Sequence, residues 1–567
     1  MSKPAVLPPD YPLTHAKQAV NRGLEIEGHL LTAGEAHVLE CWQDLSDPAA
    51  HAYARLIQRR VFPVRVDQFH HPALPRMVDA LSELAVAGFL STGKQLPRAE
   101  RLQRLKVPEL RANCRHLGLP HAGNKGELLR ALSGRHDITE PAMVSPRHRG
   151  LFRRVFRAAL QNHAGDLSRE VLDQMGVRRS AEYALSSGSG RFRNRLSLVA
   201  YEEALVDRHK EDQGDHLECA RTLTERIESL GPPQPWEYRF SAYRQLTHLL
   251  VSSLRNAERT EPAAKVATAY RRALSLGTKH RAGLTARLAL VEERAGRPGV
   301  GLEVCLSGLS AQPDALALHR TGSRLARKVS KTWPYPRDRV APKVKKILLP
   351  QSPADEAGPA PPQRVERAVI TALSLHGRRA LHSENGIWTT LFALIYDAAL
   401  FEPVDGALPC PHLTGPLDLG TTAFRSARHG LIEEIQNQVR SGEVAALITA
   451  AWNKRQGQAV AGAHWTAFDL DLLTSVAKAM AADSLNAIMD VFIDDWYGAK
   501  RGLPDLTILP GPEVSFFGTV VEKGLKFVEI KGPGDTLRDR QAWWLRALTA
   551  ADIDAEVWQI KPLKGMT

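Results

Sequence analysis

The sequence predicts a mostly helical protein of several domains that ends in an α/β domain. At 567 residues the chain is too long for one hydrophobic core, and its length favours roughly three or four domains. Apolar residues recur at the spacing of amphipathic helices through most of the chain. After Trp496 the pattern changes to the alternation that is typical of β-strands.

The composition is that of folded domains with a basic surface. Hydrophobic residues make up 43% of the chain, which is enough for ordinary packed domains. Lys and Arg number 75 against 62 Asp and Glu, so the formal net charge is 75 − 62 = +13. This balance favours a polyanionic partner such as nucleic acid, although many basic proteins bind none. Charge alone therefore leaves both interpretations open.

Cysteine usage and hydropathy point away from secretion and membranes. The five cysteines lie far apart and include no C-x-x-C pair, so neither a disulfide framework nor a zinc site is expected. The first residues lack the apolar stretch of a secretion signal. No apolar run approaches the roughly 20 residues that cross a bilayer. We therefore expect a soluble intracellular protein with free or buried thiols and no membrane partner.

Residues 1–95 predict an N-terminal DNA-binding domain. A helix to about residue 58, an alternating stretch at 61–66 and a second helix that ends at Gly88 resemble a winged-helix module. The candidates for its DNA-binding face are the arginines Arg55, Arg59, Arg60 and Arg65. A charged rim on a purely structural domain is the alternative.

Residues 96–138 predict two short amphipathic helices. The first carries Leu105, Leu110, Cys114 and Leu117, and the second carries Leu128, Leu129 and Leu132. Gly118 ends the first helix, and Asn124 caps the second. Basic residues stand between the apolar positions, namely Lys106, Arg111, Arg115, Lys125 and Arg130. The pattern resembles the SAP motif, which binds DNA, and a charged hairpin that only packs is the alternative.

Two further segments precede the end of the chain. Residues 139–335 are helical almost throughout, and their antiparallel pairs approach the spacing of tetratricopeptide repeats. Such arrays are usually scaffolds or protein-binding surfaces. Proline-rich, charged sequence at 336–365 predicts a linker, because proline at this density does not continue helices. The remaining domain is expected at 366–567.

The candidate site lies near the end of the chain. We expect strands at 505–509 and 525–531, a helix from about residue 537 and a closing strand at 555–560. Alternate residues of a strand share a face, so Glu529 and Lys531 point to the same side. Asp505 begins the neighbouring strand.

These residue types suit phosphodiester hydrolysis. Two carboxylates hold Mg²⁺ or Mn²⁺, which stabilises the charge that develops on the phosphate and lowers the pKa of bound water. A second ion clamps both the attacking and the leaving oxygen. Lys531 beside the metal is suited to position or deprotonate the attacking water and to pair with the phosphate.

The surrounding residues carry a specific resemblance. Pro-Asp at 504–505, Glu-Ile-Lys-Gly-Pro at 529–533 and the later residues Asp535, Arg540, Gln541 and Trp544 resemble the VRR-NUC domain of the PD-(D/E)XK nucleases. The order of winged-helix-like start, SAP motif, helical repeats and this domain resembles the Fanconi-associated nuclease family, in a bacterial type without the N-terminal zinc finger. The resemblance covers nearly the whole chain.

The resemblance implies further site residues. Glu384, in the string HSENG, matches a family glutamate that joins Asp505 and Glu529 at the metal. The backbone carbonyl of Ile530 is implied as another ligand, and Gln541 is implied to point at the metal centre. An acid at the start of a helix is the structural alternative for Glu384. Asp535 is also expected to cap the following helix.

The implied activity is a structure-selective DNA endonuclease that cuts 5′ flaps and has 5′→3′ exonuclease activity in interstrand crosslink repair. The expected cofactor is Mg²⁺ or Mn²⁺, with two ions, and the partner is branched or flapped DNA. Alternatives are a junction-resolving or restriction-type endonuclease and a catalytically silent DNA-binding scaffold. The expected location is the nucleoid-bearing cytoplasm in a bacterium and the nucleus in a eukaryote.

One implied feature departs from the family pattern. Some relatives hold a 5′ phosphate in a basic pocket of the helical repeats, and His319 matches its histidine. The pocket arginine falls near Gly283, with Arg281 only close by. The sequence therefore leaves the pocket, and movement in steps from a 5′ end, open.

Overall fold

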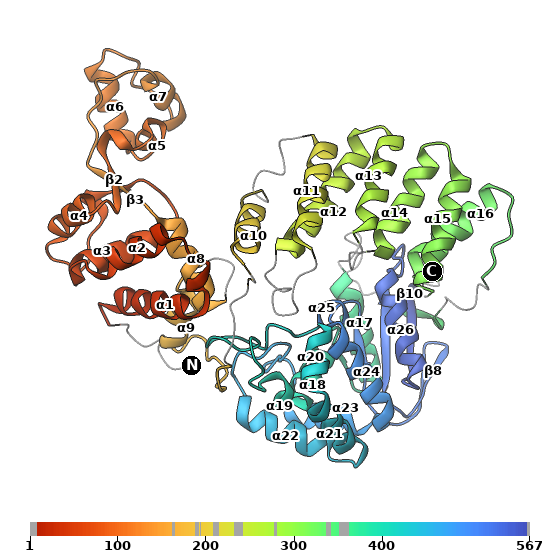
Figure 1. Cartoon of the computed structure of the whole chain (residues 1–567). Coiled ribbons are helices and arrows are strands. Elements are labelled where there is room, and N and C mark those ends of the chain that lie inside the picture. Colours follow the sequence, from red (N-terminus) through yellow and green to blue (C-terminus); the bar gives the residue numbers. More distant parts are fainter. Residues whose placement is uncertain are drawn as a thin grey trace. The chain divides into compact units, whose positions relative to one another are not determined.

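The computed structural model describes residues 8–161, 165–186, 192, 194–207, 215–231, 242–276, 281–313, 315–335, 342–350 and 362–563. The chain divides into two compact units (Figure 1). The N-terminal unit comprises Met1–Ser180, Gly188–Arg191 and Pro409–Leu413, and the C-terminal unit comprises Ala181–Ser187, Phe192–Leu408 and Thr414–Thr567. Among the described residues, no helix has the length and apolar character needed to cross a membrane.

The N-terminal unit combines helices with a small antiparallel sheet. Its elements are α1 (Tyr11–Glu27), α2 (Ala33–Gln43), α3 (Asp47–Ile57), β1 (Val64–Arg65), α4 (Met77–Val86), β2 (Leu90–Thr92), α5 (Arg98–Gln103), α6 (Val107–His116), α7 (Lys125–Leu132), β3 (Met143–Pro146), α8 (Arg149–Leu160) and α9 (Ser168–Gln174). Within the described residues, the strand order is β1-β3-β2. Trp42, Tyr53, Phe89 and Phe152 pack edge to face in the core. Helices and a short sheet around one core agree with the predicted winged-helix-like start.

The predicted domain boundary after residue 138 is wrong. β3 pairs with both β1 and β2, and α8 packs against α1, so residues 143–160 complete the N-terminal core. The predicted SAP segment is therefore an insertion between β2 and β3. Strand pairing across such an insertion is a long-range event, which a local apolar pattern does not report.

Arg65 does not belong to a DNA-binding face, contrary to the prediction. Its side chain is 4% exposed and makes paired hydrogen bonds to the carboxylates of Asp67 and Glu109. Glu109 lies in α6, so this buried arginine joins the inserted segment to the host domain. Arg59 and Arg60 are exposed, as the prediction requires.

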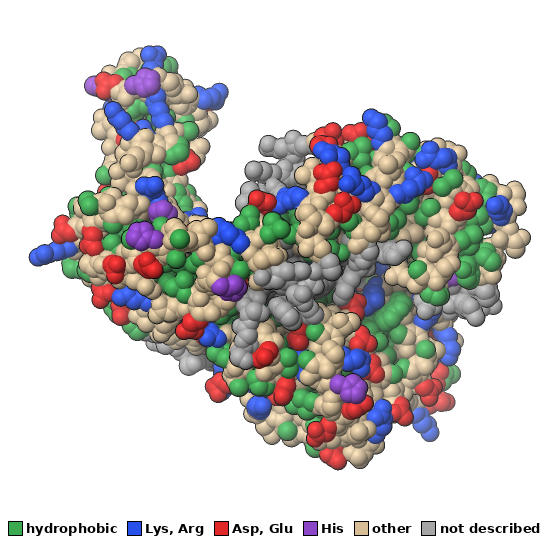
Figure 2. Space-filling view, viewed as in Figure 1, with side chains coloured by type: hydrophobic (Ala, Val, Ile, Leu, Met, Phe, Trp, Pro, Cys, Tyr) green, Lys and Arg blue, Asp and Glu red, His purple; other side chains and the backbone are tan. Residues whose placement is uncertain are grey.

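The inserted segment has its own small core. Leu105, Leu110, Cys114, Leu128 and Leu132 are buried together, in agreement with the predicted apolar faces. Asn124 caps α7 by accepting a hydrogen bond from the backbone N–H of Glu127 at 3.1 Å. The basic residues Lys106, Arg111, Arg115, Lys125 and Arg130 are all exposed. Blue Lys and Arg side chains stand out over α5–α7 in Figure 2.

The first part of the C-terminal unit is a stack of helices (Figure 1). Its members are α10 (Arg195–Asp207), α11 (His216–Leu230), α12 (Ala242–Thr260), α13 (Ala263–Ser275), α14 (Arg281–Arg294), α15 (Pro298–Ala311) and α16 (Leu316–Lys328). From α11 onward, each helix packs on the next. The buried carboxylate of Glu258 on α12 accepts hydrogen bonds from Tyr270, Arg287 and Arg294, which ties three helices together. This stack is the predicted helical-repeat array.

The rest of the C-terminal unit is an α/β domain. Its elements are β4 (Val344–Pro350), α17 (Pro362–Leu375), β5 (Ala380–His382), α18 (Gly386–Ile395), α19 (Asp397–Leu400), α20 (Thr422–Ala427), α21 (His429–Arg440), α22 (Val444–Arg455), α23 (Leu470–Lys478), α24 (Ala482–Asp494), α25 (Trp496–Ala499), β6 (Leu506–Ile508), β7 (Val514–Phe516), β8 (Thr519–Val521), β9 (Lys526–Lys531), α26 (Asp539–Ala550) and β10 (Ala555–Leu563). Within the described residues, the main sheet has the order β4-β10-β9-β6-β5, and β7 pairs with β8. Both faces of the sheet are buried, one of them under α18, α26 and their neighbours.

The predicted linker at 336–365 is wrong in its centre. Residues 344–350 form β4, an edge strand that pairs in parallel with β10. The stretch VKKILL has a strand pattern, but the prolines around it dominated the prediction. Residues 336–341 and 351–361, which the prediction also covered, lie outside the described residues. The other predicted strands are observed within one to three residues of their expected bounds.

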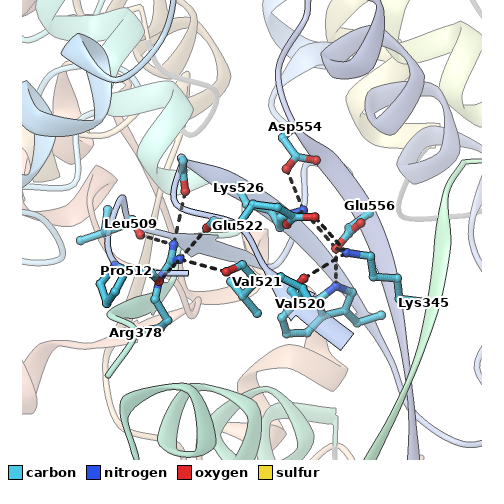
Figure 3. A network of polar contacts seen from close by, with 12 residues as sticks. Lys345, Arg378, Leu509, Pro512, Val520, Val521, Glu522, Lys526, Asp554 and Glu556 are labelled. Carbon is cyan, nitrogen blue, oxygen red and sulfur yellow. Dashed lines mark hydrogen bonds and ion pairs between the residues drawn. The ribbon is translucent and has the colours of Figure 1, made fainter. Parts of the chain in front are cut away.

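Arg378 fixes the β7–β8 hairpin and the loops around it to the sheet (Figure 3). Its side chain is only 1% exposed. The guanidinium donates to the backbone carbonyls of Leu509, Pro512, Val521, Glu522 and Gly524. One side chain therefore donates to five backbone carbonyls of these segments, and the contacts to Leu509 and Val521 are buried.

A second polar cluster lies beside it in Figure 3. The buried Lys526 ammonium lies 2.8 Å from Glu522, 2.7 Å from Asp554 and 3.3 Å from Glu556. Glu556, also buried, is 3.1 Å from Lys345 of the edge strand. These contacts join β4, β9 and β10 at the end of the sheet where β9 begins.

The Arg378 contacts predict a stability effect. Arg378→Met should lower the free energy of unfolding of the α/β domain by about 3 kcal/mol or more, because several buried carbonyls lose their donor. Urea titration followed by tryptophan fluorescence measures this change. Arg379→Met is the matched control, because Arg379 is exposed. Equal effects of the two substitutions would contradict the role given to Arg378.

Candidate functional site

Three strands bring the predicted acidic residues to one end of the sheet. β6 runs antiparallel to both β5 and β9, so its start meets the ends of its two neighbours. The register pairs Leu506 with Val528, which places Asp505 opposite Glu529 on the same face. On the other side, the backbone N–H groups of Ser383 and Glu384 donate to the carbonyl of Asp505 at 2.9 and 3.0 Å. Asp505 and Glu529 therefore lie on adjacent strands at this end of the sheet, and Glu384 lies in the turn that follows β5.

Asp505 is held by the strand that carries Glu529. Its Oδ2 accepts a hydrogen bond of 2.8 Å from the backbone N–H of Ile530. Burial raises the pKa of the Asp505 carboxyl, and the nearby Glu384 adds to the rise. The Ile530 N–H and the ammonium of Lys531 act in the opposite direction. Asp505 is thus a fixed carboxyl in a place that disfavours its negative charge.

Glu529 is the most deeply buried acid of the group. Its side chain is 1% exposed, and its Oε2 has no hydrogen-bond partner within the described part of the chain. Burial and the adjacent Asp505 raise the pKa of Glu529 to about 8, against the opposing effect of Lys531. A buried carboxylate oxygen without a donor is costly unless a proton or a cation neutralises it. The Asp505–Glu529 pair therefore fits a divalent cation by its donor type and by this unpartnered oxygen.

Lys531 and Gln541 lie against Glu529, as predicted. The Lys531 ammonium is 2.7 Å from Glu529 Oε1 and donates to Gln541 Oε1 at 3.1 Å. Gln541 Nε2 in turn donates to Glu529 Oε1. Gln541 Oε1 also accepts from the backbone N–H of Arg538 at 3.0 Å, so the side chain belongs to the capping box of α26. The start of the helix thereby orients the glutamine toward the acids.

Asp535 does not cap this helix, so the predicted N-cap is wrong. The N-cap position is Arg538, and α26 begins at Asp539. Asp535 Oδ2 instead accepts a hydrogen bond of 3.1 Å from the backbone N–H of Gly532, within the Gly-Pro-Gly turn. The aspartate therefore stabilises the turn between β9 and α26. The N-cap was misplaced because this turn is longer than the sequence pattern indicated.

Glu384 lies in the turn before α18, with a positive φ of 33°. Its Oε1 accepts from Asn385 Nδ2 at 3.1 Å, and Asn385 Oδ1 accepts from the backbone N–H of Leu503 at 3.2 Å. The side chain is exposed, unlike those of Asp505 and Glu529. Over the described ranges, no group of three or more His, Cys, Asp or Glu side chains is close enough to hold a metal ion. The close pair is Asp505 with Glu529, and ligation by Glu384 and by the Ile530 carbonyl stays a prediction.

The structure adds two residues that the sequence did not single out. Glu366 on α17 lies 2.7 Å from His382 on β5. Burial raises the pKa of Glu366, and the carboxylates of Asp505 and Glu384 raise it further, so Glu366 faces the same acidic region. Glu366 escaped notice because it falls at the edge of the predicted linker. The histidine that precedes Glu384 by two residues is the signal that was present.

Helix α26 also fixes the segment that leads to Asp505. Trp544 Nε1 donates to the carbonyls of Ala499 and Arg501 at 3.0 and 3.1 Å. Arg540 donates to the carbonyl of Gly498 at 3.1 Å, and its guanidinium lies over the ring of Trp543. α26 therefore holds the backbone segment that precedes Asp505, while Gln541 in its first turn contacts Glu529 and Lys531.

His319 is buried between aromatic rings in the helical repeats. It is 7% exposed, its Nε2 donates to the Pro313 carbonyl at 2.7 Å, and its ring packs edge to face on Trp333 and Tyr335. Its place in this cluster gives no support to the implied phosphate pocket. The side chain of Arg281 lies outside the described residues.

Two known domain families match segments of this chain. The VRR-NUC domain family matches residues 440–562, and the SAP domain family matches residues 101–132. The VRR-NUC match contains Asp505, Glu529, Lys531 and Gln541, and the SAP match contains α6 and α7.

Curated relatives match nearly the whole chain. A Fanconi-associated nuclease 1 homolog of Arabidopsis thaliana is 26% identical over an alignment of 588 positions, which covers 94% of this chain and 65% of the relative. A homolog of Oryza sativa is 24% identical, and the match covers 94% of this chain and 61% of the relative. The chain thus spans less than two thirds of the length of these plant relatives. A homolog of Pseudomonas aeruginosa is 24% identical, with 99% of this chain and 97% of the relative covered.

A solved structure shares the fold. The crystal structure of paFAN1 bound to 2nt 5′flap DNA with gap has a TM-score of 0.82 and 23% sequence identity, and the match covers 99% of this chain and 100% of that chain. The predicted resemblance and the predicted fold class are confirmed: a SAP domain, helical repeats and a C-terminal α/β nuclease-type core occur in the expected order.

The buried acids predict a pH-dependent stability. The pKa of Glu529 is about 8 in the folded protein against an ordinary value of 4.5. Its contribution to stability is therefore complete below about pH 4.5 and is lost as the pH rises through about 8. The melting temperature of metal-free protein should fall between about pH 6 and pH 9, and divalent cations should raise it most at the alkaline end.

Glu529→Gln should reduce both effects, since the amide does not titrate. Glu513→Gln is the control, because Glu513 is an exposed glutamate of the same domain. Differential scanning fluorimetry across the pH range measures the change. An unaltered pH profile in Glu529→Gln would show that another group controls this stability.

Proposed function

We propose that this chain, a relative of the Fanconi-associated nucleases with a VRR-NUC domain, is a metal-dependent DNA nuclease that cuts at 5′ flaps. The observation that carries the proposal is the buried Asp505–Glu529 pair, with its unpartnered Glu529 Oε2 and with Lys531 at 2.7 Å from the other oxygen. Two facing carboxyls with an ammonium group beside them are the residue types that metal-assisted phosphodiester hydrolysis uses.

Each residue has a distinct part in this proposal. The proposed metal ligands are Asp505, Glu529, Glu384 and the carbonyl of Ile530, which would hold Mg²⁺ or Mn²⁺, with two ions as the expected number. When bound, these ions stabilise the charge that develops on the phosphate and lower the pKa of the attacking water. Lys531 orients that water and pairs with the scissile phosphate. Gln541 keeps Lys531 and Glu529 in place through its two hydrogen bonds.

Lys531 is held in place by two polar contacts. Its ammonium contacts Glu529 Oε1 and Gln541 Oε1, and its side chain is 13% exposed. From this position beside the two acids, Lys531 would contact a phosphate bound at the site and orient the attacking water.

The DNA substrate is proposed on two grounds. The exposed basic residues of α6 and α7 form a surface suited to the phosphate backbone, and such contacts position DNA without reading its sequence. The solved relative carries 5′-flap DNA by its printed description. We extend the proposal to 5′→3′ exonuclease activity and to a role in interstrand crosslink repair, which the family resemblance implies.

Loss of Lys531 should separate cleavage from binding. Lys531→Met should reduce cleavage of a labelled 5′ flap at least about 100-fold, because positioned proton-transfer groups contribute on that scale. Binding of the flap in Ca²⁺ should stay within about twofold, because phosphate contacts elsewhere provide most of the affinity. Asp505→Asn should behave in the same way.

The matched control is Lys523→Met, because Lys523 is exposed in the loop before β9. It should cut at the rate of the unmodified protein. Unchanged cleavage by both Lys531→Met and Asp505→Asn would refute the site assignment. Loss of binding in step with cleavage would instead indicate a folding defect.

The substrate class is tested by a product ladder. A 5′-flap substrate labelled at its 3′ end should give a cut near the junction and then shorter products from the 5′ side, in Mg²⁺ or Mn²⁺ and not in EDTA. A panel of flaps, nicks, gaps and four-way junctions sets the preference. Symmetric cutting of four-way junctions in preference to flaps would favour a junction-resolving enzyme. No cutting of any substrate would favour a DNA-binding scaffold.

A further inference from the structure

One arginine of the helical repeats contacts the start of α26. Arg320 lies on α16 and donates from Nη1 to Asp539 Oδ1 at 3.0 Å. Its Nη2 donates to the backbone carbonyl of Leu537 at 2.9 Å. The two acceptors are on either side of Arg538, so the planar guanidinium spans the N-cap of α26.

The same N-cap controls the orientation of Gln541. The backbone N–H of Arg538 donates to Gln541 Oε1 at 3.0 Å, and Lys531 donates to that oxygen at 3.1 Å. The amide nitrogen of Gln541 donates to Glu529. A displacement of the backbone at 537–539 would therefore move the side chain that joins Lys531 to Glu529.

The contact is too exposed to matter much for stability. The side chains of Arg320 and Asp539 are 51% and 45% exposed. Surface ion pairs of this kind contribute about 0–1 kcal/mol. A guanidinium bound at two points nevertheless fixes geometry, which a flexible lysine does not do. Misplacement of a catalytic group by about 1 Å can reduce a rate about 100-fold.

We propose that Arg320 is a positioning residue, which sets the first turn of α26 and through it the orientation of Gln541 and Lys531. The inference rests on the proposed nuclease function. It makes the geometry of the reacting groups depend on α16, and hence on the helical repeats, although the site residues proposed above all lie outside α16.

The test compares four variants of the full chain. Arg320→Gln, Arg320→Lys, Asp539→Asn and the double variant Arg320→Gln/Asp539→Asn are assayed for kcat and KM on a 5′ flap, for flap binding in Ca²⁺ and for amide hydrogen exchange at residues 538–542. Arg324→Gln is the matched control, because Arg324 lies one turn further along α16 and pairs with Glu293 inside the repeats.

The expected result is a change in turnover without a change in binding. Each single variant should lower kcat about tenfold with KM and flap affinity within about twofold, and the double variant should be no worse than Arg320→Gln. Arg320→Lys should not restore kcat. Exchange at residues 538–542 should become faster in Arg320→Gln, with an unaltered melting temperature, while Arg324→Gln changes none of these.

Two results would overturn the proposal. Unaltered exchange at residues 538–542 in Arg320→Gln would show that the arginine does not hold the first turn. Weaker flap binding with an unchanged kcat in Arg320→Gln, but not in Asp539→Asn, would make Arg320 a ligand of the DNA backbone. If the unmodified protein cuts no DNA while exchange responds as expected, the proposed function fails and the contact keeps its positioning role.

Discussion

The antiparallel pairing of β6 with β9 is the constraint on which the site depends. It places Asp505 directly opposite Glu529, and the Ile530 N–H then holds the Asp505 carboxyl in that position. Burial and mutual proximity disfavour the negative charges of these two acids, so the metal-free domain loses stability as the pH rises and Glu529 loses its proton. The surrounding structure has to supply the compensation, and a sheet that is buried on both faces does so. A bound cation would relieve this unfavourable electrostatic interaction between the two acids.

Helix α26 converts this pair into an organised centre. Its first turn orients Gln541 between Lys531 and Glu529, and its later residues Arg540 and Trp544 hold the backbone before Asp505. Both acidic strands and the lysine therefore depend on the position of one helix. At the opposite end of the sheet, Arg378 and Lys526 secure the hairpin and the edge strand. At that end the buried charges of Arg378 and Lys526 each have several partners, whereas at the end with Glu529 its Oε2 has no hydrogen-bond partner among the described residues.

The site could be predicted from sequence where its residues follow a strand period. Glu529 and Lys531 share a face because alternate residues do, and Asp505 follows from a proline-led strand start. Glu384 has no such signal, because it lies in a turn with a positive φ, and only the family resemblance pointed to it. Glu366 was missed because its helix, α17, follows a proline-rich stretch that was predicted to be a linker.

β3 and β4 were missed because both strands pair with strands that are distant in the chain. The N-cap of α26 was misplaced because a Gly-Pro-Gly turn gives no local measure of its length.

The insertion of the small helical domain between β2 and β3 limits how that domain can move. The chain leaves the host sheet after Thr92 and returns at Met143, and these two strands are hydrogen-bonded neighbours. A domain that is joined to its host by two paired strands can bend about that connection, but its rotation about the strand axis is restricted compared with a domain on a single linker. The hydrogen bonds from Arg65 to Glu109 of the inserted domain restrict this bending further. The exposed basic residues of α6 and α7 are therefore restricted in the directions that they can face relative to the host domain.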